Sequence, residues 1–159
     1  VGIQRPLDAP QSRLIRFKAT ICVTGYIKEC RLVYTLFWGI PVSKKVLIID
    51  DDKIALSILK TFLLEKGLDV HTAQDGLGGL EKMKNMKPDL IILDVMMPNM
   101  DGYGFLREIK KEPKFRAIPV VVLTGREMMR DLFVQEGVQD FVRKPCSQEE
   151  LYNTVSKYL

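Results

Sequence analysis

Three consecutive aspartates, Asp50, Asp51 and Asp52, follow the apolar run VLII. Carboxylates on neighbouring residues repel one another, and the end of a strand does not require them. One carboxylate can accept hydrogen bonds from the first turn of a following helix, and we assign Asp52 to that N-cap role. Asp50 and Asp51 remain, and we infer that a positively charged group binds beside them.

Polar residues also follow the other long apolar runs of the chain. Asp94 ends LIILD, Thr124 and Gly125 follow VVVL, and Lys144 and Pro145 follow DFVR. The carboxyl ends of parallel strands lie along one edge of a sheet, where ligands bind, so we expect these residues to meet there. Each residue alone is more often structural than functional, and it is their agreement that indicates a site.

This set of side chains suits magnesium-assisted phosphoryl transfer. Mg²⁺ prefers carboxylate and carbonyl oxygens as ligands. A phosphoryl group in transfer needs positive charge and hydrogen-bond donors around its oxygens, which Mg²⁺, Lys144 and the Thr124 hydroxyl would supply. Gly125 would leave room for the group to enter, and Asp94 can serve as the nucleophile.

Strands and helices that would position these residues alternate five times from Lys44 onward. The expected strands are residues 46–50, 69–73, 88–94, 118–124 and 138–144, and the expected helices are residues 52–67, 75–86, 102–112, 126–137 and 147–159. Continuous apolar strands are typical of a parallel sheet with helices on both faces. Gly78 and Gly79 each cost a helix about 1 kcal/mol relative to Ala, so we expect the second helix to be short or frayed.

Residues 1–43 form an N-terminal extension without a periodic pattern, and the domain proper is residues 44–159. A small β-hairpin or docking arm is one interpretation of the extension. Another is that residues 1–41 are not native and reflect an over-extended reading frame whose true start is the Val42 codon. A ribosome-binding sequence just ahead of that codon would support the second hypothesis.

Charge and composition narrow the classes of protein. The net charge of +4 comes entirely from residues 1–41, because the other 118 residues carry 18 basic and 18 acidic groups. We therefore expect no nucleic-acid partner. No apolar run reaches the roughly 20 residues of a membrane span. The three cysteines form no CxxC pair, which is typical of reduced thiols in a cytoplasmic protein.

Residues 44–159 resemble the receiver domain of two-component response regulators. The resemblance rests on VLIIDDD, PDLIILDVMMPNMDG, IPVVVLTG and DFVRKP, in this order. It implies an α/β, flavodoxin-like, doubly wound parallel sheet of five strands in the order 2-1-3-4-5, with five helices.

By the same resemblance, Asp94 accepts a phosphoryl group from a histidine kinase or a histidine phosphotransfer protein. Asp51 and Asp94 would bind Mg²⁺ directly, the backbone carbonyl of Met96 would be a further ligand, and Asp50 would act through water.

Thr124 and Lys144 would contact the phosphoryl group, and the bond before Pro145 would be cis. The resemblance also implies a switch, in which Thr124 moves inward on phosphorylation and the ring of Phe141 follows it.

Access to the phosphoryl group would be set by Gly125, Arg126 and Met96. A bulky apolar side chain and a long cationic one beside the site predict slow self-dephosphorylation.

We interpret the chain as a stand-alone receiver that switches binding to an unknown output protein. It would be no enzyme beyond its own phosphorylation and dephosphorylation, and a monomer or a weak phosphorylation-dependent dimer without a membrane partner. Two alternatives stay open: a receiver fragment of a hybrid kinase or multidomain regulator, and an interaction module that does not depend on phosphorylation.

Overall fold

The computed structural model describes residues 43–125 and 130–159. Five parallel strands form one sheet in the order β2-β1-β3-β4-β5, which confirms the predicted fold class. The strands are β1 (Lys45–Ile49), β2 (Asp69–Ala73), β3 (Leu90–Asp94), β4 (Val120–Thr124) and β5 (Asp140–Arg143). The expectations for residues 1–42, including the over-extended reading frame, lie outside the described residues.

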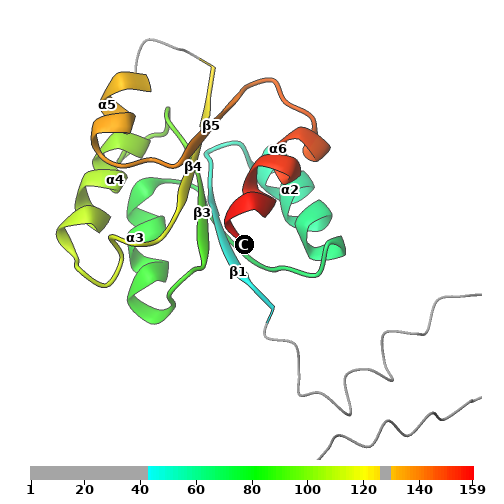
Figure 1. The fold of residues 1–159 in the computed structure, drawn as a ribbon, viewed down its shortest axis with the longest axis horizontal. Helices are drawn as coiled ribbons and strands as arrows, with labels where there is room; N and C mark the ends of the chain where they lie inside the picture. Colours follow the sequence, from blue (N-terminus) through cyan, green and yellow to red (C-terminus); the bar gives the residue numbers. More distant parts are fainter. Residues whose placement is uncertain (1–42, 126–129) are drawn as a thin grey trace, which may run out of the picture. The chain divides into compact units, whose positions relative to one another are not determined.

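Helices cover both faces of the sheet (Figure 1). The α-helices are α2 (Lys53–Glu65), α3 (Gly76–Asn85), α4 (Gly102–Lys111), α5 (Arg130–Gln135) and α6 (Gln148–Val155), followed by a 3-10 turn, η2 (Ser156–Tyr158). Helices α2 and α6 lie on one face, and α3, α4 and α5 lie on the other. None of the helices in the described ranges has the length and hydropathy of a membrane span.

The alternation of side chains along the central strands divides the core into two layers. Leu47 and Ile49 of β1 pack with α4 residues such as Phe105 on one face. Val46 and Ile48 pack with residues of α2 and α6 on the other face. Because both faces of β1 and β3 are covered, residues 46–49 and 90–93 are all apolar, as a sheet buried on both sides requires.

Side chains at four helix N-termini accept hydrogen bonds from the first turn. The capping residues are Asp52, Asp75, Asp101 and Ser147. Asp52 accepts from the backbone N–H groups of Ile54, at 2.8 Å, and Ala55, at 3.2 Å. Its predicted role as an N-cap is therefore confirmed.

Helix α3 corrects one expectation from the sequence. It runs for ten residues, Gly76–Asn85, and is neither short nor frayed at its glycines. A Cβ on Gly79 would lie 2.6 Å from Ile49 Cδ1 and 2.9 Å from Phe105 Cε2. Gly79 thus allows the helix to approach the sheet closely, and this packing outweighs its poor helix propensity.

We expect Gly79→Ala to lower the free energy of unfolding by up to about 2 kcal/mol, measured by urea denaturation. An overpacking penalty of about 1–3 kcal/mol exceeds the gain in helix propensity of about 1 kcal/mol. Gly78→Ala is the matched control, because a Cβ there would meet nothing closer than Asp75 Oδ1 at 3.2 Å. A Gly79→Ala protein as stable as the original would contradict this account.

Candidate functional site

The strand register brings the polar strand ends to one edge of the sheet. Ile49 pairs with Leu93, so Asp50 and Asp94 follow as neighbours. On the other side of β3, Asp94 pairs with Leu123, which precedes Thr124. Thr124 in turn pairs with Arg143, which precedes Lys144. These four strand ends therefore lie along one edge, as the parallel sheet predicts.

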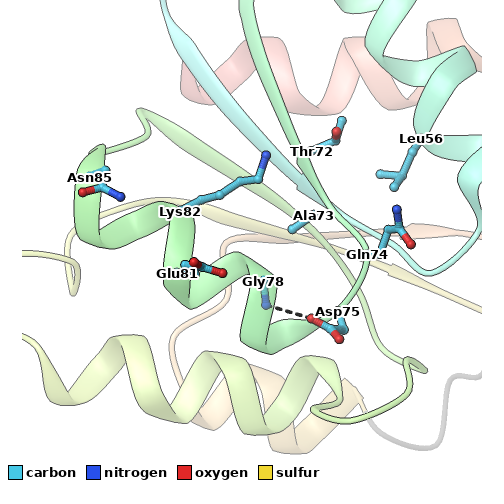
Figure 2. Close-up of a pocket in the computed structure, with 9 residues that line it drawn as sticks. All are labelled: Leu56, Thr72, Ala73, Gln74, Asp75, Gly78, Glu81, Lys82 and Asn85. Carbon is cyan, nitrogen blue, oxygen red and sulfur yellow. Dashed lines mark hydrogen bonds between the residues drawn. The ribbon is translucent and has the colours of Figure 1, made fainter.

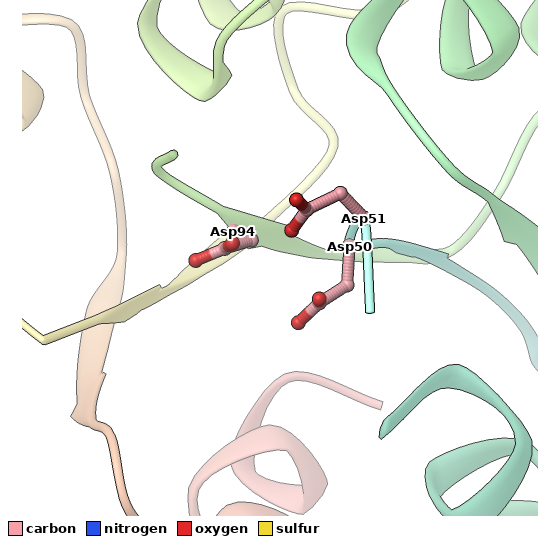
Figure 3. Close-up of side chains that lie close together, drawn as sticks. All are labelled: Asp50, Asp51 and Asp94. Atoms are coloured by element: carbon pink, nitrogen blue, oxygen red, sulfur yellow. The ribbon is translucent and has the colours of Figure 1, made fainter. Parts of the chain in front are cut away.

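Asp50, Asp51 and Asp94 form an acidic cluster at this edge (Figure 3). Each offers one carboxylate oxygen, and the three oxygens lie within 4.8 Å of one another. Asp50 is completely buried and Asp94 is 7% exposed, whereas Asp51 is open to solvent. Three hard oxygen donors at this spacing fit a divalent cation such as Mg²⁺, which would enter from the side of Asp51.

Lys144 forms ion pairs with two of the three carboxylates of this cluster. Its Nζ lies 2.6 Å from Asp50 Oδ2 and 3.1 Å from Asp94 Oδ1. Burial alone would lower the pKa of Lys144, but its hydrogen bonds and charge attraction to Asp50 and Asp94 raise it. The ammonium group is therefore held charged between two buried carboxylates.

The two oxygens of Asp94 have different surroundings. Oδ1 accepts a hydrogen bond from the backbone N–H of Val95 at 2.9 Å, in addition to its ion pair with Lys144. Oδ2 has no hydrogen bond or ion pair within the described part of the chain. Burial raises the pKa of Asp94, and the nearby Asp50 carboxylate adds to this effect while Lys144 opposes it. One oxygen is thus held in place, whereas no described residue holds the other.

The remaining expected residues that the structure describes differ in burial. Thr124 is half-buried, and a Cβ on Gly125 would meet no atom of the described residues within 4 Å. Met96 exposes 61% of its surface. The Lys144–Pro145 peptide bond is cis, as the resemblance implied. Arg126 lies outside the described residues.

Phe141 is half-buried on β5 and packs against the core layer of α3, α4 and α5. Phe141 pairs with Val122, two residues before Thr124, so Val122 and Thr124 point to the same face of β4. The guanidinium carbon of Arg130 lies 5.0 Å from the centroid of the Phe141 ring. The sequence contained no signal for this contact.

The loop between β3 and α4 is anchored by contacts that sequence reasoning missed. Asn99, whose φ of 62° is left-handed, donates from Nδ2 to Asp75 Oδ2 at 2.7 Å. The backbone N–H of Gly76 donates to the Met100 carbonyl at 3.1 Å. A Cβ on Gly102 would collide with the carbonyl oxygen of Asp94. The motif PNMDG offered the only sequence signal, a turn after the strand.

Fold and site together define a flavodoxin-like α/β domain with an acidic cluster at the carboxyl edge of its sheet. The sequence model of the family described as "Response regulator receiver domain" matches residues 46–156. The chain belongs to this family, whose members are phosphorylatable receivers of two-component systems.

Relatives and solved structures agree with this assignment. The protein PilG of Pseudomonas aeruginosa is 34% identical over 117 residues, which is 72% of this chain and 87% of that protein. A receiver domain of a signal transduction histidine kinase from Syntrophus aciditrophicus is 35% identical, with a TM-score of 0.68 over 74% of this chain and 90% of that one. Chemotaxis protein CheY4 of Vibrio cholerae is 28% identical, with a TM-score of 0.70 over 74% of this chain and 99% of that one.

Other relatives are much longer than this chain. Hybrid signal transduction histidine kinase D of Dictyostelium discoideum is 37% identical over 111 residues, which is 69% of this chain and only 7% of that protein. The chain likewise spans 15% of one further relative and 49% of another. Receiver domains of this family therefore occur within larger proteins as well as in short ones.

We expect Asp51→Asn to weaken Mg²⁺ binding at least about tenfold, because a hard cation loses one of three carboxylates. Isothermal titration calorimetry measures the affinity. Asp52→Asn is the matched control, since that carboxylate caps α2 and an amide oxygen can replace it. Equal affinities of the two variants would contradict a metal site at the acidic cluster.

Proposed function

We propose that Asp94 is the phosphoacceptor of this receiver and that a histidine kinase or a histidine phosphotransfer protein is the donor. The observation that carries the proposal is the arrangement of Asp94, with Oδ1 held by Val95 and Lys144 and Oδ2 without a partner in the described residues. Oδ2 would attack the phosphorus atom of a phosphohistidine. The phosphorus–nitrogen bond would break, and its electron pair would leave with the imidazole.

The surrounding residues would then stabilise the transferred group. The ammonium of Lys144 would lie against phosphoryl oxygens where charge develops, and the Thr124 hydroxyl would donate a hydrogen bond. Gly125, which has no side chain and no described atom within 4 Å of its Cβ position, would leave room for the group. A Mg²⁺ ion bound by Asp51, Asp94 and the Met96 carbonyl, with Asp50 acting through water, would neutralise further charge on the phosphoryl oxygens. The same residues would catalyse dephosphorylation, and no other reaction is proposed.

Thr124 and Phe141 would report phosphorylation to the surface. A phosphoryl group on Asp94 would draw the Thr124 hydroxyl towards it, and the half-buried ring of Phe141 would move into the space that Thr124 leaves. Such a switch works only through contacts that differ between the two states. The surface formed by α5, β5 and α6 would change shape, and an output protein would bind one of its two forms.

Intact-mass measurement after incubation with a small phosphoryl donor tests the proposal. We expect the protein to gain one phosphoryl group in the presence of Mg²⁺, and Asp94→Asn to gain none. Asp52→Asn, which leaves the acidic cluster intact, should be phosphorylated like the original protein.

An adduct that persists in Asp94→Asn would overturn the assignment of the phosphoacceptor. If a purified histidine kinase also fails to phosphorylate the original protein, the phosphorylation-independent interaction module becomes the better description.

We also expect the phosphorylated protein to lose its phosphoryl group slowly, because Met96 places a bulky apolar side chain two residues after the phosphoacceptor. The decay of the adduct, followed by mass after the donor is removed, measures this rate. A half-life of only seconds would contradict the expectation.

A further inference from the structure

Strand β2 is the terminal strand of the sheet and leaves one edge without a neighbour in the described part of the chain. Asp69 donates its backbone N–H to the Lys44 carbonyl, and the Ala73 carbonyl accepts from Asp50, so both residues face β1. Backbone groups alternate in direction along a strand, so Val70 and Thr72 face outward. An open edge of this kind can pair with another extended chain.

Two hollows meet along this edge and give it walls. One, of about 560 Å³, lies between β2 and α3 and is lined by residues such as Gln74, Gly78 and Lys82 (Figure 2). The other, of about 310 Å³, lies between α2 and β2. Leu56, Thr72 and Gln74 line both, so the two hollows form one continuous groove, which we call the β2 groove. An extended segment beside β2 would lie within it.

Lysines line the β2 groove on both sides of the strand edge. Lys53 and Lys60 come from α2, and Lys82 comes from α3 and reaches towards the strand (Figure 2). All three are exposed, and none forms an ion pair with another described residue. Their charges are therefore available to a ligand.

Two carboxylates also line the groove, and they restrict the choice of ligand. Asp75 accepts hydrogen bonds from the backbone N–H of Gly78 and from Asn99, and these lower its pKa. Its carboxylate therefore stays charged, and both of its oxygens already have hydrogen-bond donors. Glu81 is exposed on the side of α3. A continuous phosphate backbone would approach both carboxylates closely, whereas a peptide can place its acidic residues next to the lysines alone.

We infer that the β2 groove binds an extended, acidic segment of a partner protein, which pairs with Val70 and Thr72 as a sixth strand. Main-chain hydrogen bonds to an open edge would supply affinity, and the lysines would select acidic side chains. The same lysines disfavour a second copy of this chain, because two β2 edges would bring like charges together. This inference is independent of the chemistry of Asp94.

Nuclear magnetic resonance of the full chain with a synthetic peptide of alternating Glu and Val tests the inference. We expect the peptide to shift the amide signals of Val70 and Thr72 and to protect these amides from hydrogen exchange. The amides of His71 and Ala73, which face β1, serve as internal controls. A peptide with Lys in place of Glu, and one N-methylated at alternate residues, should both bind weakly or not at all.

Charge reversal on the protein separates this groove from other basic parts of the chain, including the basic sequence of residues 1–41. Lys60→Glu/Lys82→Glu should weaken binding of the acidic peptide about tenfold, since two favourable charge contacts become repulsive. Lys84→Glu/Lys87→Glu is the matched control, because neither of these exposed lysines lines the groove.

Three results would overturn the inference. One is equal binding to both double variants, and a second is equal binding of the N-methylated peptide. The third is concentration-dependent protection of Val70 and Thr72 without peptide, which would identify a second copy of the chain as the occupant. None of these measurements requires phosphorylation of Asp94, so their outcome does not depend on the test of the proposed function.

Discussion

The ammonium group of Lys144 lies between the carboxylates of Asp50 and Asp94, and the rest of the site depends on this arrangement. Both carboxylates are buried, and a buried charge without a partner is strongly destabilising. Lys144 offsets that cost from a strand end that is 94 residues away from Asp50 in the chain. The parallel sheet is what makes this encounter possible, because it places the ends of β1, β3 and β5 at one edge.

The surroundings of Asp94 are packed on one side and open on the other. Gly102 approaches the Asp94 carbonyl so closely that a Cβ has no room, and Asn99 and Met100 tie the following loop to the start of α3. On the side of β4, a Cβ on Gly125 would meet no atom of the described residues within 4 Å. A carboxylate held in one orientation is what the proposed transfer reaction requires of its nucleophile.

Most of the fold could be predicted from the sequence, because periodicity, capping residues and turn formers act locally. Asp52 illustrates this, since an aspartate between a strand and a helix is a strong N-cap signal. Gly79 illustrates the limit. Its low helix propensity predicts fraying. Ile49 and Phe105, which belong to other elements, lie so close to Gly79 that a Cβ has no room there, and only glycine fits. The anchoring of the β3–α4 loop and the contact between Arg130 and Phe141 were missed for the same reason.

The sequence by itself determined the order of the elements and the types of the residues that follow each strand. It thereby determined that three carboxylates, a hydroxyl and a lysine would share one edge of a parallel sheet. Only the tertiary structure decided that Asp94 Oδ1 is held while Oδ2 is free of partners in the described residues, and that Asp50 is wholly buried whereas Asp51 is exposed. It also decided that two hollows meet along β2. The physical reason is that burial and hydrogen-bond partners depend on distances between segments remote in the chain, which no local pattern encodes.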